Sequence, residues 1–207
     1  MDFKMHLQTA WEHTLQFIVP LILLTLVQIV VSVFSFGILL PVTTAGYMQS
    51  LLLALREGRE PKLGDLFSEM QLFLPLFVFG LLSMLAVSLG FVLLILPGFL
   101  VVGFLVFATI YVVPLMTDQK MGLIEAVKGS WQMATRDPLA DQMILMVLYL
   151  VILSVGGSIA VAALFTQPLA TFVVLSVYEE RLQGKQAVIG QSTMPPPPPP
   201  PPADKVV

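Results

Sequence analysis

Residues 70–117, MQLFLPLFVFGLLSMLAVSLGFVLLILPGFLVVGFLVFATIYVVPLMT, contain no Asp, Glu, Lys or Arg over 48 positions. Two further runs share this property, residues 13–55 with 43 positions and residues 142–178 with 37. At ~1.5 Å per helical residue each run gives roughly 55–72 Å of helix, about twice the ~30 Å hydrocarbon core of a bilayer. Each run therefore predicts a helical hairpin that crosses a membrane twice.

Three such hairpins predict an all-α, polytopic membrane protein with six transmembrane helices. Composition agrees, because 57% hydrophobic and 11% charged residues leave little polar surface for a water-soluble protein of 207 residues. The second span contains Thr43, Thr44 and Gln49, which are polar for a lipid-facing helix, so we expect it to be packed inside the bundle. The membrane domain covers residues 1–182, with spans at roughly 17–36, 39–55, 72–95, 98–116, 141–163 and 167–182.

The positive charges predict the orientation of the chain in the membrane. All ten Lys and Arg residues lie at the N-terminus, between the runs or after the last run, so the three hairpins would place all ten on one side. The positive-inside rule makes that side, with both termini, cytoplasmic. A net charge of −3 without a Lys/Arg cluster indicates no nucleic-acid partner.

An amphipathic segment with an aromatic residue precedes each predicted hairpin. Segment 121–136 is the clearest, with Ile124 and Trp131 on one face and charged or polar residues on another. Trp11 and Phe67 hold comparable positions before the first and second hairpins. Such helices lie in the cytoplasmic interface with the aromatic ring at head-group level, so these three aromatic residues are the predicted membrane anchors. The pattern fits three diverged repeats, or simply membrane hairpins joined by short loops.

Four short motifs recur in a known family. They are Gly64-Asp65-Leu66-Phe67, Leu96-Pro97-Gly98-Phe99, Val113-Pro114-Leu115 and Asp118-x-x-x-Gly122-x-x-Glu125-Ala126-x-x-x-Ser130-Trp131. On these motifs the chain resembles, over most of residues 5–182, the six-helix membrane domain fused to some bacterial glycerophosphoryl diester phosphodiesterases, and its stand-alone YciC-like relatives. The resemblance implies a six-helix fold in the bacterial cytoplasmic (inner) membrane. It implies no phosphodiesterase activity, because the catalytic domain of the fused proteins is absent from this sequence.

The sequence holds no recognisable catalytic or cofactor motif. The patterns G-x-S-x-G, H-E-x-x-H and the P-loop do not occur, and cysteine is absent. If helical, His6 and His13 lie two turns or ~10.5 Å apart, too far to share a metal, and we interpret them as interfacial side chains. Carboxylates outside the runs, such as Asp65, Glu69 and Glu179, are interpreted as solvated loop charges. The sequence therefore predicts a protein that is not an enzyme and uses no cofactor.

Polar side chains inside the predicted spans are expected at helix contacts. Ser154, Ser158 and Ala162 form a small-residue seam where another helix approaches closely. Gln28 and Gln167 are the best candidates for contact with a polar solute, and buried structural amides are the alternative.

Residues 183–207 are predicted to form a disordered, cytoplasmic, proline-rich tail. A run of eight prolines adopts polyproline II at ~3.1 Å per residue, a rod of roughly 25 Å. The rod either docks in an aromatic-lined groove of a partner or serves as a spacer. The candidate partner-binding residues are Pro195, Pro196, Pro197, Pro198, Pro199, Pro200, Pro201 and Pro202.

The sequence is compatible with two functions of different class. The first is a non-enzymatic membrane scaffold or accessory protein, with membrane lipids and a cytoplasmic or membrane protein as partners. The alternative is a channel or facilitator for a neutral or lipid-derived solute. A continuous polar path lined by Gln28, Thr43, Thr44 and Gln49 would favour the alternative, and a tightly packed interior would favour the scaffold.

Overall fold

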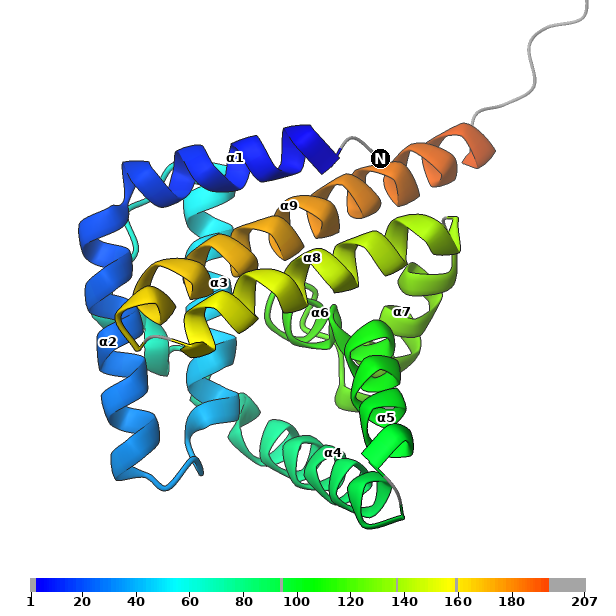
Figure 1. The fold of residues 1–207 in the computed structure, drawn as a ribbon. Helices are drawn as coiled ribbons and strands as arrows, with labels where there is room; N and C mark the ends of the chain where they lie inside the picture. The colour runs from blue at the N-terminus through cyan, green and yellow to red at the C-terminus, as the bar shows by residue number, and fades with distance from the viewer. Residues whose placement is uncertain (1–2, 94, 137, 159, 194–207) are drawn as a thin grey trace, which may run out of the picture.

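The computed structural model describes residues 3–93, 95–136, 138–158 and 160–193, and within these residues it contains helices and no strand. Figure 1 shows how the helices are arranged. They are α1 (Phe3–Gln16), α2 (Ile18–Phe34), α3 (Leu40–Glu57), the short 3-10 helices η1 (Leu63–Phe67) and η2 (Met70–Leu72), α4 (Phe73–Leu93), α5 (Ile95–Thr109), α6 (Val112–Thr117), α7 (Leu123–Arg136), α8 (Leu139–Ser158) and α9 (Ala160–Thr193).

Several helices are long and apolar enough to cross a membrane. Among the described residues four stretches qualify, and α1 with α2 makes a fifth if this pair, bent by 88°, counts as one span. Two of the six predicted spans, α2 and α3, do not qualify alone, because α2 has only 17 residues and α3 carries many polar ones. The four stretches are Leu63–Val92, Pro97–Thr117, Leu139–Gly156 and Ala162–Gly184.

Helix α3 lies in the core of the fold. Its side chains Val42, Leu51 and Leu52 are fully buried, and Leu51 and Leu52 share one hydrophobic core with Phe172 and Tyr178 of α9. The polar residues of α3 are covered as well, since Thr43 and Ser50 are also fully buried. The structure thus confirms that this polar segment is packed inside the bundle, where Thr43 donates to its own helix and Ser50 to Asp65 of η1.

Helix α1 packs along α9 before the chain bends into α2 (Figure 1). Its inner face presents His6, Ala10 and Thr14, all buried, and Trp11 contacts Phe165 of α9 with ring centroids 5.5 Å apart. The chain bends by 88° at Phe17, between α1 and α2, and Pro20 follows as the third residue of α2, where a missing N–H costs no helical hydrogen bond.

Helices α4 and α5 pack against each other at the outside of the fold (Figure 1). Most exposed side chains of α4 are large and apolar, among them Leu74, Met84 and Val92, which are 67%, 68% and 82% exposed. A surface of this kind suits lipid rather than water as its neighbour.

The segment after α3 folds back onto that helix instead of staying at its end. Gly46, in the middle of α3, lies so close to η1 that an added Cβ atom would be 2.3 Å from the carbonyl oxygen of Asp65 and 2.5 Å from that of Leu66. Asp65 accepts hydrogen bonds from Ser50 at 2.7 Å and from Arg59 at 2.6 Å. The interpretation of Asp65 as a solvated loop charge is therefore wrong. Glycine at position 46 leaves room for η1 against α3, and this packing places Asp65 next to Ser50 and Arg59.

Helix α9 is longer than the sixth predicted span. It continues to Thr193, so the predicted start of the tail at residue 183 falls inside a helix. The proline run lies outside the described residues, and the tail stays a prediction there.

Candidate functional site

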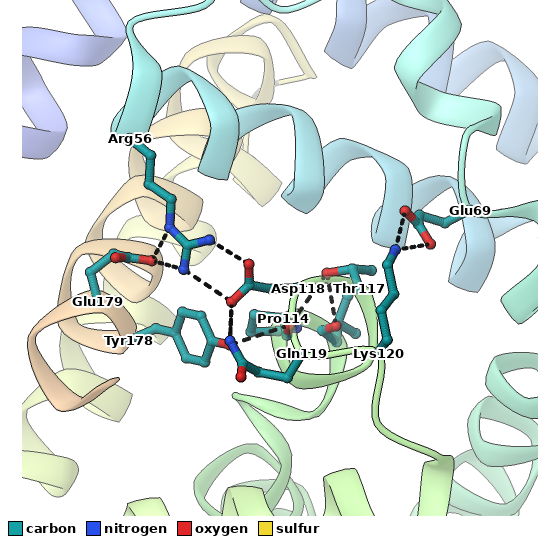
Figure 2. Close-up of polar contacts among 10 residues, drawn as sticks. Arg56, Glu69, Pro114, Thr117, Asp118, Gln119, Lys120, Tyr178 and Glu179 are labelled. Atoms are coloured by element: carbon teal, nitrogen blue, oxygen red, sulfur yellow. Dashed lines mark hydrogen bonds and ion pairs between the residues drawn. The ribbon is translucent and has the colours of Figure 1, made fainter. Parts of the chain in front are cut away.

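Three charged residues from distant parts of the chain meet where α3 and α6 end beside α9 (Figure 2). The Arg56 guanidinium pairs with both oxygens of Asp118, and its Nε donates to Oε1 of Glu179 at 2.7 Å. Each is the first charged residue after one of the three uncharged runs. We call Arg56, Asp118, Glu179 and the adjoining Tyr178 the polar layer. It links the ends of α3 and α6 to α9.

Asp118 is the most buried carboxylate of the polar layer, with 8% of its side chain exposed. Burial raises its pKa, but the hydrogen bonds from Arg56, Gln119 and Tyr178 outweigh that effect and hold the pKa of Asp118 below its ordinary value. The Tyr178 hydroxyl donates to Oδ2 of Asp118 at 3.0 Å. Asp118 is consequently ionised at neutral pH and remains a full partner for the guanidinium.

Two further contacts between elements flank the polar layer. His6 of α1 is 1% exposed and lies between two side chains of α9, with Nδ1 at 2.7 Å from the Ser176 hydroxyl and Nε2 at 2.5 Å from a Glu180 oxygen. Lys120 pairs at 3.1 Å with Glu69, which is 5% exposed. His6 is thus a buried clamp rather than an interfacial side chain, and Glu69, Glu179 and Glu180 are structural partners rather than free loop charges.

The Ser176–His6–Glu180 contacts have the order of a catalytic Ser–His–carboxylate relay, but their surroundings differ from one. Ser176 lies inside α9, where backbone N–H groups are used by the helix itself and leave no donors for an oxyanion. The imidazole also presents Nδ1 rather than Nε2 to the serine. Among the described residues no group of His, Asp or Glu could hold a metal ion. We therefore interpret the contacts as a clamp between α1 and α9.

Arg181 extends the polar end of α9 toward α7. Its guanidinium lies 5.1 Å from the ring centroid of Tyr111 and donates to the Met133 carbonyl oxygen at 2.5 Å. That carbonyl belongs to the last turn of α7, where backbone acceptors lack helical partners and a cation is favoured. Arg181 thereby ties the C-terminal end of α7 to the helix that carries the polar layer.

A second polar group lies roughly 18 Å farther along α3, counted at ~1.5 Å per residue from Arg56 to Thr44. Gln28 of α2 accepts a hydrogen bond from the Gln167 amide of α9 at 2.8 Å and donates to the Thr44 hydroxyl at 3.1 Å. These three side chains line a cavity of about 390 Å³ between α2, α3, α8 and α9, which we call the glutamine cavity. Gln28 and Gln167, the two predicted solute-contact candidates, are thus brought together.

The polar path through Gln28, Thr43, Thr44 and Gln49, which would favour a channel, is only partly present. Thr44 and Gln28 line the glutamine cavity, whereas Thr43 and Gln49 do not. Thr43 is fully buried and donates to the Leu39 carbonyl of its own helix at 3.0 Å. A cavity therefore exists, but the residues proposed for a continuous path do not form one.

The three predicted anchors are all partly exposed. Trp11 is 48% exposed, Phe67 40% and Trp131 44%. Trp131 contacts Phe104 and Phe107 of α5, with ring centroids 5.9 and 6.2 Å away. Each anchor thus has one side on the protein and one side free, which is the arrangement that an interfacial ring needs.

The structure describes the predicted small-residue seam only in part. Ser154 donates to the Val151 carbonyl of its own helix at 2.8 Å, Ala162 is half-buried, and the side chain of Ser158 lies outside the described residues. Helices α8 and α9 lie close together at Gly156, where an added Cβ would be 2.0 Å from the Thr166 hydroxyl oxygen. The seam stays a prediction, as do the partner-binding prolines 195–202.

Comparisons of the chain with protein-family models, curated proteins and solved structures give no match.

Proposed function

We propose that the chain crosses a bacterial cytoplasmic membrane six times, as three hairpins with the polar layer on the cytoplasmic side. The observation that carries this proposal is the meeting of Arg56, Asp118 and Glu179. Because each directly follows one uncharged run, their contact requires that all three runs end on the same face of the fold. The bacterial membrane rests on the resemblance to the YciC-like family.

Within that topology we propose a non-enzymatic scaffold or accessory protein. The interior between the glutamine cavity and the polar layer supports this role, because Leu51, Leu52, Phe172 and Tyr178 there are fully buried. Ion pairs and a closely packed core hold the cytoplasmic ends of α3 and α6 against α9. Such a fixed cytoplasmic face suits a protein that presents a surface to partners.

Helix α7 is the surface best suited to that role. Its inner face consists of small residues, Ala126, Ser130 and Ala134, which allow close packing on the fold. Its outer face exposes Ile124 at 71% and Trp131 at 44%. We propose that this outer face lies in the head-group region, within reach of a membrane-bound partner.

A facilitator for a neutral or lipid-derived solute is the second candidate, and the glutamine cavity favours it. The packed core on the cytoplasmic side of the cavity opposes it, since passage would require several buried side chains and the polar layer to separate.

Photocrosslinking from position 131 tests the scaffold role. Replacing Trp131 by p-benzoylphenylalanine in native membranes is expected to yield one reproducible protein adduct, identified by mass spectrometry. The control carries the same residue at Phe34, the last residue of α2, which is 81% exposed. In the proposed topology Phe34 lies on the side of the membrane away from the polar layer, so it should capture lipid alone. Lipid adducts alone from both positions would contradict the scaffold role.

A further inference from the structure

We propose that the glutamine cavity binds the head group of an uncharged, hydroxyl-bearing lipid. The inference goes beyond the scaffold role and does not depend on it, and it requires no transport. It rests on the hydrogen-bonding capacity of three side chains, on the absence of charge in the lining and on the position of the cavity in the fold.

The side chains around the cavity hold hydrogen-bonding capacity that the described residues leave unused. Gln28 uses its carbonyl oxygen for Gln167 and one amide hydrogen for Thr44. Within the described residues the carbonyl oxygen of Gln167 and the hydroxyl hydrogen of Thr44 have no partner. The amides of Gln28 and Gln167 also keep one hydrogen each, so one carbonyl oxygen and three donor hydrogens remain. A hydroxyl group donates and accepts at the same time, so it can bond to the free carbonyl oxygen and to one of these donors.

Three other polar side chains of the lining are already satisfied. Thr166 and Thr171 donate to carbonyl oxygens of their own helix at 3.1 and 2.9 Å, and the Tyr47 hydroxyl bonds to Thr25 at 3.1 Å. The spare capacity thus lies on the glutamine and Thr44 side chains and on the hydroxyl of Tyr149, which also lines the cavity and has no partner within the described residues.

The lining excludes a charged ligand. It contains no Asp, Glu, Lys, Arg or His. An ion placed there would lose its hydration without gaining a counter-charge, which costs several kcal/mol or more in a membrane interior. Uncharged hydroxyl groups need only the hydrogen bonds that the amides and Thr44 offer.

The surroundings of the cavity favour a lipid over a water-soluble alcohol. Leu40, Met48 and Leu153 make up part of the wall. Helices α3 and α8 both line the cavity but do not pack closely against each other, which leaves room for an acyl chain between them. A volume of 390 Å³ accommodates a small head group with the beginning of its chains, at the lower end of ligand pockets. The remaining chain length would extend into the bilayer.

The test uses the full-length protein in phosphatidylcholine vesicles that contain a photoreactive, clickable diacylglycerol. We expect the probe to label wild-type protein in α3, α8 or α9. Thr44→Val and Gln167→Leu should each reduce labelling about five- to tenfold, the effect of one lost hydrogen bond in a dry site. Leu153→Trp, which fills the cavity without touching the amides, should reduce it similarly.

Thr43→Val is the matched control, because Thr43 is the neighbouring threonine and bonds only to its own helix. It should label like wild type, and thermal unfolding in detergent should show that all variants fold. Excess unlabelled diacylglycerol should compete, whereas free glycerol should not. Equal labelling of wild type and the three cavity variants would show that the cavity does not bind the lipid head group. Competition by free glycerol, or equal labelling by a photoreactive phosphatidic acid, would overturn the ligand class.

Discussion

Replacing Arg56 by alanine is expected to lower the free energy of unfolding by about 2–4 kcal/mol. The substitution leaves the carboxylates of Asp118 and Glu179 facing each other, with their side chains only 8% and 20% exposed. Removing one partner of a fully buried ion pair costs about 3–5 kcal/mol, and the one-third exposure of Arg56 reduces that value. Titration with SDS in mixed micelles, followed by tryptophan fluorescence, measures the change.

Two variants control for a general effect of charge. Arg136→Ala removes an exposed arginine at the end of α7 and should cost less than about 1 kcal/mol. Arg56→Lys keeps the charge but loses the forked geometry that reaches both carboxylates, so an intermediate loss is expected. If Arg56→Ala unfolds no more easily than Arg136→Ala, the polar layer does not hold the helix ends together.

Replacing Gly46 by alanine is expected to destabilise the fold by about 2–3 kcal/mol, despite the higher helix propensity of alanine. The new Cβ would lie 2.3 and 2.5 Å from backbone carbonyl oxygens of η1. Backbone atoms cannot rotate away as a flexible side chain can, so η1 must shift and strain the bonds of Asp65 with Ser50 and Arg59. We expect a lower unfolding temperature and faster hydrogen exchange in residues 63–72.

Gly103 of α5 provides the matched control, since nothing lies within 4 Å of a Cβ added there. Gly103→Ala should leave stability unchanged or raise it by up to about 1 kcal/mol. Equal behaviour of the two alanine variants would show that η1 does not rest on α3 in the protein.

The helical, membrane-type fold was predictable from the three uncharged runs, because their lengths and composition fit few other structures. The direction of α1 before the break at Phe17 was not, because it depends on the packing of α1 along α9. The position of Asp65 was missed because its partners, Ser50 and Arg59, become neighbours only when η1 folds back along α3. In each case contacts between elements outweigh the local sequence pattern.

The two polar groups differed in how far they were predictable. Gln28 and Gln167 were predictable as candidates because they are amides in otherwise apolar spans, and the structure joins them by a hydrogen bond. The polar layer was missed, although the sequence held the signal. If three hairpins end on one face, the first charged residue after each run lies at the same level. One of these is a cation and two are anions, so a contact between them could have been expected.

The central claim is that all three uncharged runs begin and end on the same side of the membrane. The accessibility of single cysteines to a maleimide tests it most directly. The sequence has no cysteine of its own, so each substitution reports one position. With a membrane-impermeant maleimide and intact bacterial cells, we predict no labelling of Lys62→Cys, Lys128→Cys or Lys185→Cys until the cells are permeabilised. Ile38→Cys and Phe99→Cys should label at once. Labelling of any of the three lysine positions in intact cells would contradict the common face and remove a hairpin.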